Sequence, residues 1–517
     1  MARWDAKNLE IRTRSVEQAL VPLVAQITTL VNLKERIKLT DKSKQILKAA
    51  GTNIQKAIDS FSNVGQTIAA ENDDIADDMN ETCSEALKSG EIILKLTDLN
   101  ESLSLDKAAI VQVSRVLLGS ITRSLLLADV VAVKKLVRAA EKVDEKLREL
   151  ENVHIFTDFV QAFSQFGADM VELAHVSGDR QNDLKDDKQR AEMCAARAVL
   201  EKSTMMLLTS CKTCLRHPDS PLALGNRSGV FQCMRTAMST LKEIVQENSY
   251  EPSLEMSRGL GMEFKDFEVA VEVLFQRPDD TEIRPEIMDK LKKIISDSEN
   301  LINSEFIPSP KKNRIMAYCA NLRDLLQDLI GEFKTCSDES LDESLCQLLK
   351  QISKIMNDIN TDLTNVSLDL LTEVFINQAW KPNLQKLRLS SVNGDPGSVD
   401  LYGEKLEEDS RKMKEVSKLI CNITQSEPVV ITANKIEENM KIFLPQLVSA
   451  AKILSGHPSS KISLENMEVF ANVWETQVEE WTTLLRNVTH FDKRCGSEHK
   501  LSSKRSNKDD SEECNTL

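Results

Sequence analysis

Cys211, Cys214 and His217 are the residues whose types and spacing come nearest to a chemical site. They read Cys-Lys-Thr-Cys followed by His, a spacing found in one half of a zinc site. A zinc site needs a second pair of ligands, and the sequence offers none. Both cysteines continue the apolar spacing of Leu200 and Leu207, so we interpret them as core residues. A metal protein or an enzyme built on these three residues stays open as an alternative.

No other set of residues predicts catalysis. The sequence contains no GxSxG, phosphate-binding loop or HExxH motif. Its six histidines form no triad with a nucleophile and an acid: His154, His175, His217, His457, His490 and His499. We therefore expect no enzyme activity, no catalytic residue, no cofactor and no bound metal.

A stripe of apolar residues within NRIMAYCANLRDLLQDLIGEF is the strongest candidate for a partner-binding site. Its members recur at intervals of 4, 3, 4, 3 and 4 residues: Ile315, Cys319, Leu322, Leu326, Leu329 and Phe333. This spacing lines up one face of a helix, and such a face is first of all the core position of a helical bundle.

The composition predicts an all-α fold. Of the 517 residues, 41% are hydrophobic and only 4% aromatic, with 16 Gly and 13 Pro, so strands and tight turns are scarce. The net charge of -15 repels phosphate backbones and argues against nucleic acid as a partner. The N-terminus has charges throughout and no apolar signal region, so we expect a cytoplasmic protein without direct membrane insertion.

A helix from about 104 to 151 organises the N-terminal half. This stretch has no proline and one glycine, and would span roughly 70 Å as one straight helix. Apolar stripes mark both ends, whereas 125–133 is apolar nearly all round and is expected to be buried on every side. We interpret the helix as shared by two bundles. The alternative is two helices broken near Gly119.

The positions of the turn-forming residues predict tandem antiparallel helical bundles. Turn residues at 248–262 and 381–398 are expected to separate them. The expected parts are paired N-terminal bundles at 1–250, a first middle four-helix bundle at 263–380, a second middle bundle at 381–488 and a disordered tail at 489–517.

Several short stretches resemble the vinculin/α-catenin family. The resemblance opens with Trp4-Asp5, Leu9-Glu10-Ile11-Arg12-Thr13, Pro22-Leu23-Val24 and Thr28-Thr29-Leu30-Val31-Asn32. It continues through Leu117-Leu118, Thr122-Arg123, Cys214 to Asp219, Arg284-Pro285, Glu465-Asn466-Met467 and Trp474-Glu475. It covers about 5–488 and is nearest to the α-catulin branch. The family would continue into a third middle bundle and an actin-binding bundle, so the chain resembles a shortened form.

The resemblance implies a non-catalytic scaffold with protein partners. Resemblance to the catulins implies that the chain supports a Rho guanine-nucleotide exchange factor. Resemblance to the α-catenins implies that its first bundle binds β-catenin or a second copy of the chain. In α-catenins the first middle bundle hides a vinculin-binding helix, which matches the apolar stripe at 315–333. Tyr318 and Asp324 depart from that helix's small-residue pattern. Direct actin binding is not expected, and cytoskeletal or membrane association would run through partners.

Overall fold

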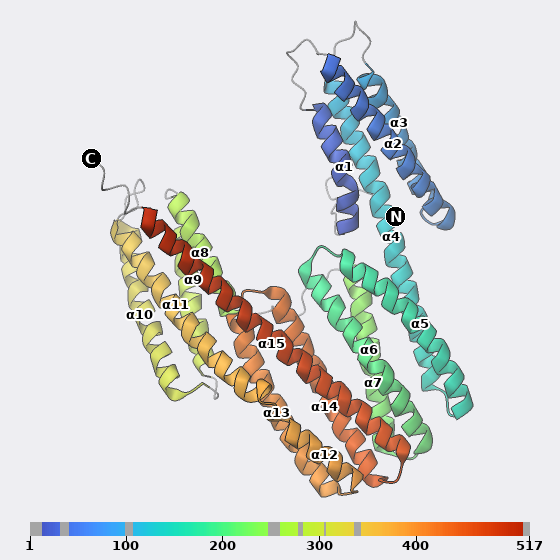
Figure 1. Cartoon of the computed structure of the whole chain (residues 1–517), viewed down its shortest axis with the longest axis vertical. Coiled ribbons are helices and arrows are strands. Elements are labelled where there is room, and N and C mark those ends of the chain that lie inside the picture. Colours follow the sequence, from blue (N-terminus) through green and yellow to red (C-terminus); the bar gives the residue numbers. More distant parts are fainter. Residues whose placement is uncertain are drawn as a thin grey trace. The chain divides into compact units, whose positions relative to one another are not determined.

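The computed structural model describes residues 13–31, 41–98, 107–246, 259–277, 283–303, 307–335 and 343–509. Helices make up almost all of these residues, and within them the one β-type pairing is an isolated bridge between Thr13 and Leu184. The predicted all-α class is confirmed (Figure 1).

The helices follow one another with short connections. The N-terminal ones are α1 (Arg14–Val31), α2 (Asp41–Glu71), α3 (Ala76–Thr97), α4 (Lys107–Glu151), α5 (Phe156–Asp183), α6 (Asp187–Arg216) and α7 (Pro221–Gln246). The others are α8 (Leu260–Gln276), α9 (Ile283–Ile302), α10 (Ser309–Thr335), α11 (Glu343–Leu371), the π-helical turn η1 (Thr372–Ile376), α12 (Lys381–Val392), α13 (Pro396–Ile423), α14 (Glu427–Gly456) and α15 (Lys461–Asp509).

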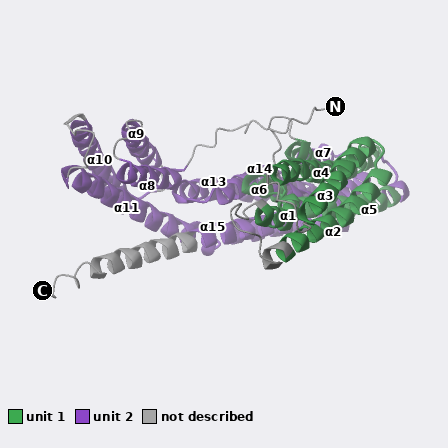
Figure 2. Cartoon of the chain, turned by 90° about the horizontal axis from the view of Figure 1, so that it is seen from above, with its two compact units in different colours: residues 1–152, 160–194, 238–248 green, residues 153–159, 195–237, 249–517 purple. Residues whose placement is uncertain are grey.

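The chain divides into two compact units, coloured separately in Figure 2. One comprises residues 1–152, 160–194 and 238–248, and the other comprises 153–159, 195–237 and 249–517. The division expected near residue 250 stays a prediction, because most of 248–262 lies outside the described residues.

Helices α1 to α4 pack around one apolar core. Each contributes one stripe, as the periodicity predicts: Val16, Leu20, Leu23, Ile27 and Leu30 from α1, Leu47, Ala50, Ile54 and Ile58 from α2, Ala86 and Ile93 from α3, and Ile110, Leu117 and Ile121 from α4. Pro22 lies inside α1 without ending it.

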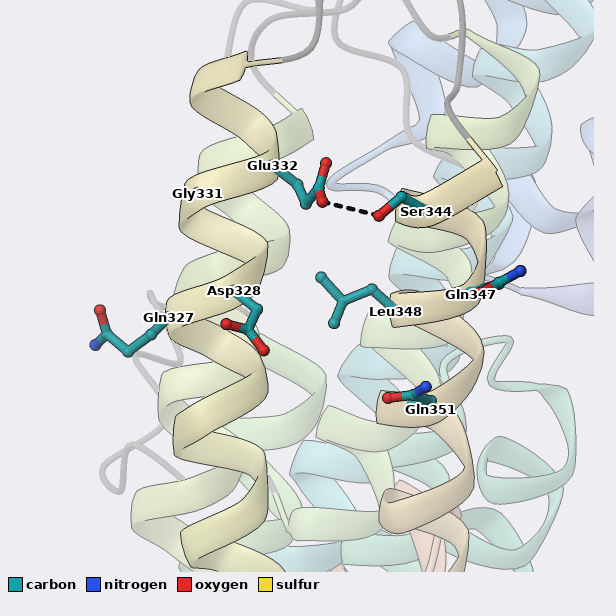
Figure 3. Close-up of a pocket in the computed structure, with 8 residues that line it drawn as sticks. All are labelled: Gln327, Asp328, Gly331, Glu332, Ser344, Gln347, Leu348 and Gln351. Atoms are coloured by element: carbon teal, nitrogen blue, oxygen red, sulfur yellow. Dashed lines mark hydrogen bonds between the residues drawn. The ribbon is translucent and has the colours of Figure 1, made fainter.

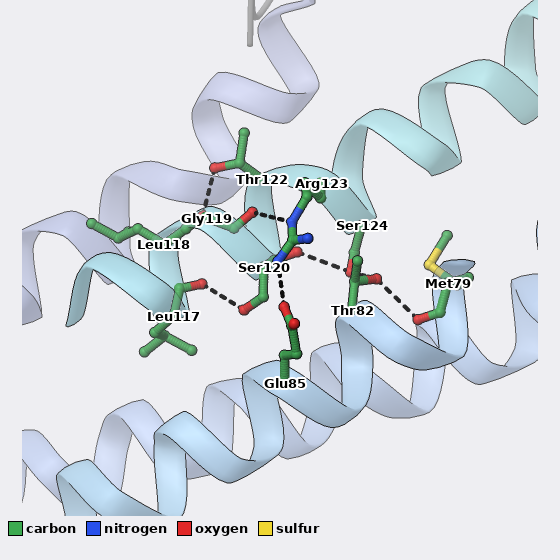
Figure 4. Close-up of polar contacts among 10 residues, drawn as sticks. All are labelled: Met79, Thr82, Glu85, Leu117, Leu118, Gly119, Ser120, Thr122, Arg123 and Ser124. Carbon is green, nitrogen blue, oxygen red and sulfur yellow. Dashed lines mark hydrogen bonds and ion pairs between the residues drawn. The ribbon is translucent and has the colours of Figure 1, made fainter. Parts of the chain in front are cut away.

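Helix α4 runs unbroken for 45 residues, so the shared-helix prediction is confirmed in its continuity and the break near Gly119 is wrong. Just beyond Gly119, α4 is tied to α3 by polar contacts (Figure 4). Arg123 pairs with Glu85, and the Ser124 hydroxyl donates to Thr82 Oγ1 over 2.6 Å. These contacts fix the rotation of α4 at the point where it leaves the first core.

The prediction that 125–133 is buried on every side is wrong. Leu127 is buried, but its neighbours are half-buried and Ala132 is exposed. Leu127 packs with Ile75 and Met79 at the α2–α3 turn, which covers one side of α4. A second side carries Asp129, which pairs with Arg180 of α5. An apolar stretch between two cores thus keeps part of its surface exposed.

Within the described residues, α4 is long and apolar enough to cross a bilayer by length and composition. The core helix of a bundle passes the same test, so this is weak evidence for a membrane span. Arg123 and Asp129 lie within the helix and are paired, which suits a polar environment better than a bilayer. Absence of membrane insertion stays a prediction.

Helices α8 to α11 form a second core, which extends onto the end of α13 through Leu419 and Ile423. The approach of α8 to α13 requires glycine. A Cβ at Gly261 would lie 2.2 Å from the carbonyl oxygen of Ile423, which is backbone and has little freedom to move. The first turn of α8 therefore rests directly on the last turn of α13.

One expectation about the C-terminal half needs correction. The interval 381–398 contains α12, because Pro382 in the first turn of a helix starts it rather than stopping it. Helix α15 is assigned as far as Asp509, and the disordered tail expected at 489–517 stays a prediction. Residues 510–517 lie outside the described residues.

The continuity of α4 predicts that Gly119→Ala raises the melting temperature. No atom lies within 4 Å of a Cβ placed there, and alanine in a helix interior is favoured over glycine by about 0.5–1 kcal/mol. Gly51→Ala in α2 is the matched control, since its Cβ would meet Thr97 Oγ1 at 2.0 Å and should lower the melting temperature. A destabilising Gly119→Ala, measured by thermal unfolding, would mean that α4 is broken in solution.

Candidate partner-binding helix

The six residues of the predicted stripe all lie on α10 and face its bundle. Ile315, Cys319, Leu322, Leu326 and Leu329 are 0–7% exposed. Phe333 is half-buried at the end of the stripe, where the Arg284 guanidinium lies 5.8 Å from its ring centre. The stripe is therefore core, and no partner can reach it while the bundle is closed.

The stripe is held by helices on both sides. Helix α10 packs between α9 and α11, and its side chains join the core cluster of α8, α9 and α11. The buried partners are mainly leucine and isoleucine, among them Ile287, Leu291, Ile294 and Ile295 from α9 and Leu345, Leu349, Ile352 and Ile359 from α11. Tyr318, one of the departures from the family pattern, is partly buried against the same core, whereas Asp324 is exposed.

A buried carboxylate fastens the first turns of α10 to α11. Asp362 of α11 is 6% exposed and accepts two hydrogen bonds from the guanidinium of Arg314. Lys311 Nζ lies 3.8 Å from the same carboxylate. These hydrogen bonds raise the pKa of Arg314 above its usual value. Because Asp362 is buried, releasing α10 would leave its charge without these partners.

A polar pocket of about 530 Å³ lies where α10 and α11 separate toward the other end (Figure 3). The Ser344 hydroxyl donates to Glu332 across it, over 2.8 Å. The remaining lining is mostly amide and carboxylate: Gln327, Asp328, Gly331, Gln347, Leu348 and Gln351. With one apolar side chain, Leu348, this pocket is not a groove for an apolar helix face.

Comparison with known proteins decides the family. The sequence profile of the Vinculin family matches residues 10–504. The chain belongs to the vinculin family. It is 37% identical to human alpha-catulin over 511 residues, covering 95% of this chain and 69% of that protein. It is 30% identical to catenin alpha of Drosophila melanogaster over 497 residues, covering 95% of this chain and 54% of that protein.

A solved structure supports the same fold. The vinculin homolog of a sponge superposes with a TM-score of 0.68 at 13% identity, covering 93% of this chain and 60% of that one. At this identity the likeness shows the fold alone. The predicted family resemblance, nearer to alpha-catulin than to catenin alpha, is confirmed by the identities of the aligned sequences.

Cys211, Cys214 and His217 occupy packing positions in this vinculin-family chain. Both cysteines are buried, and the His217 ring stacks on His457 with centres 4.0 Å apart. Burial and the neighbouring His457 lower the pKa of His217. Among the residues that the structure describes, no group of three or more His, Cys, Asp or Glu side chains could hold a metal ion.

A set of polar contacts that the sequence gave no sign of joins α6 and α7 to α14 and α15. The Asn226 amide donates to Gln446 Oε1 over 2.8 Å, and Asn466 donates to Asn226 Oδ1 over 3.3 Å. Lys212 pairs with Glu465 at 2.6 Å. The partners lie more than 200 positions apart, and polar pairs leave no periodic signal, so only the fold brings them together.

The burial of Cys319 predicts that its thiol reports on the state of α10. Burial raises the pKa of Cys319 to about 11, so almost no reactive thiolate exists at neutral pH. We expect a maleimide or disulfide reagent to modify exposed Cys194 quickly and Cys319 only after unfolding. Peptide mass mapping at pH 7 measures both rates. Equal rates at Cys194 and Cys319 in the native chain would contradict the closed bundle.

The contact with Asp362 predicts that Arg314→Met loosens α10. The substitution leaves a buried carboxylate with Lys311 alone, so we expect a lower melting temperature and faster labelling of Cys319. Arg323→Met is the matched control, because Arg323 pairs with Glu299 at the exposed face of the same helix. Equal effects of the two variants would show that the buried carboxylate has no special part in holding α10.

Proposed function

We propose that this vinculin-family chain is a non-catalytic, cytoplasmic scaffold that links cytoskeletal and adhesion-related proteins through helix faces. Membership of the family over residues 10–504 is the observation that carries the proposal. The tandem bundles support it, since each presents long helical surfaces. Attachment to the cytoskeleton or a membrane would run through partners.

The finer proposal is that the chain supports signalling by a Rho guanine-nucleotide exchange factor, as the catulin resemblance implies. The higher identity to alpha-catulin than to catenin alpha favours this assignment. The alternative is an adhesion adaptor that binds β-catenin, as the resemblance to α-catenins implies. A binding experiment separates the two functions.

Proximity labelling in cells, followed by pull-down with purified chain, tests this choice. The catulin-type function predicts capture of a Rho guanine-nucleotide exchange factor and not of β-catenin. Capture of β-catenin alone would establish the alternative. Failure to capture any cytoskeletal, junctional or Rho-pathway protein would contradict the scaffold.

A peptide covering 309–335 should bind the helical bundle of vinculin more tightly than the whole chain does. In the chain the stripe is buried, and opening the bundle reduces the apparent affinity by the fraction of open molecules. We expect at least a tenfold difference by calorimetry or fluorescence anisotropy. Leu322→Asp in the peptide is the control that should abolish binding. Equal affinities of peptide and chain would mean that α10 is accessible without opening.

A further inference from the structure

The turn between α6 and α7 occurs a second time in the chain, between α14 and α15. Residues 217–220 read His-Pro-Asp-Ser, and residues 457–460 read His-Pro-Ser-Ser. In both turns the serine amide donates to the histidine carbonyl, over 3.2 Å in the first and 2.9 Å in the second. The flanking helices also match, with the same residue type 240 positions apart at Leu207 and Leu447, Lys212 and Lys452, Leu224 and Leu464, and Asn226 and Asn466. The chain thus contains two helical hairpins of one type.

These two hairpins pack with corresponding residues against each other. The His217 ring stacks on His457, with ring centres 4.0 Å apart and ring planes 8° apart. Asn466 donates to Asn226 Oδ1 over 3.3 Å. All four residues belong to one compact unit of the chain (Figure 2). Corresponding residues meet in this way about a two-fold axis, so a charge gained by one residue faces the same charge on its counterpart.

The lysines of the two hairpins avoid this problem, because the sequences differ where their partners lie. Lys212 of α6 pairs with Glu465 of α15 at 2.6 Å. The residue that corresponds to Glu465 in the first hairpin is Gly225, and Lys452 pairs instead with Asp400 of α13 at 2.8 Å. Each lysine therefore has an acid, whereas the two histidines have each other.

The surroundings of the His217 ring oppose a proton on it. The ring is half-buried, and the charged groups that act on it are His457 from the facing turn and Arg216 from its own helix. Burial first, and then these two cations, lower the pKa of His217 from its usual 6.5. The hydroxyls of Ser460 and Ser463 lie 3.4 and 3.3 Å from Nε2. Because a hydroxyl can donate to the neutral ring or accept from the protonated one, these contacts suit both states.

The other charged side chains near the turns give a proton on His217 little support. Glu465 of α15 is already paired with Lys212. Asp219 and Lys461, which lie two and four positions beyond the histidines of their turns, are exposed. Water and salt screen charges at such positions. A proton shared between the two rings is therefore not balanced by a buried acid.

We propose that the contact between the α6–α7 hairpin and the α14–α15 hairpin is pH-sensitive, closed while His217 and His457 are neutral and loosened when protons give both rings the same charge. Loosening would uncover the facing surfaces around Asn226 and Asn466, which are buried in the closed contact. The proposal concerns the bundles themselves and stands whichever partner the scaffold binds.

The direction of the pH effect follows from the state that binds the proton better. Since the closed contact lowers the pKa of His217, the separated hairpins take up the proton more readily. The closed contact therefore keeps its full strength above the ordinary value of 6.5 and loses it as the pH falls below that value. One proton changes the equilibrium by at most about tenfold per pH unit. His457 is exposed, so protons reach the pair directly from solvent.

Carbodiimide cross-linking of the full chain tests the contact, because this reagent joins an ammonium to a carboxylate where the two touch. The product of Lys212 with Glu465 reports on the closed hairpins. The product of Lys414 with Glu437, which lie 2.8 Å apart between α13 and α14, is the reference within the same molecule. We expect the ratio of the first product to the second, measured by mass spectrometry, to fall at least threefold from about pH 7.5 to about pH 5.5.

Two variants separate the histidine pair from the pH dependence of the reagent. His457→Gln removes one of the two charges, so its ratio of products should change little with pH. His175→Gln is the matched control, since His175 is an exposed histidine that lies 3.7 Å from Asp179 within α5, and it should keep the full change. A ratio that stays constant in the native chain, or that falls equally in His457→Gln, overturns the proposal.

NMR of the chain labelled with carbon-13 histidine tests the charge between the rings. The signal of His217, assigned by its loss in His217→Gln, should titrate with a pKa below 6.5. In His457→Gln this pKa should rise toward 6.5, because the facing charge is gone. A pKa of His217 that is the same with and without His457 would show that the two rings do not oppose each other's protons, and would contradict the proposal.

Discussion

The structure depends on one constraint: every helix must bury an apolar stripe against its neighbours, and in the α8–α11 bundle no helix can leave without uncovering the other three. Burial of one aliphatic side chain contributes roughly 1.5–3 kcal/mol. The four buried aliphatic residues of the α10 stripe therefore hold the helix with something on the order of 10 kcal/mol, taken as an upper estimate.

This magnitude decides how the candidate site can work. An opening cost on the order of 10 kcal/mol leaves about one molecule in ten million open, since each 1.4 kcal/mol is a factor of ten. A partner that bound the open helix with a nanomolar dissociation constant would gain about 12 kcal/mol. After the cost of opening is subtracted, it would hardly bind the intact chain. A partner that binds the α10 stripe would thus need an additional input that loosens the bundle, and the contacts of Asp362 with Arg314 and Lys311 are among those that such an input would have to break. Surfaces already exposed are available without it.

Apolar periodicity predicted the parts of the fold that rest on repeated spacing. The stripe from Ile315 to Phe333 and the unbroken α4 were both recognisable, because 3- and 4-residue intervals persist over several turns. The same reasoning overestimated the burial of 125–133, since apolar composition does not say how many neighbours cover a helix. It missed α12 because Pro382 can end a helix or begin one. Contacts such as Asn226 with Gln446 were beyond its reach, as they depend on how distant helices meet.

The central claim is that the α10 stripe is closed within its bundle and becomes available only when the bundle opens. Native-state hydrogen exchange, resolved along α8 to α11 in the full chain, tests it most directly. The account predicts that amides from Cys319 to Leu329 exchange as slowly as those of α11 around Ile352 and Ile359, and that they do so in one cooperative opening. Exchange of the α10 amides well ahead of those in α8, α9 and α11 would show that α10 opens on its own, and would contradict the claim.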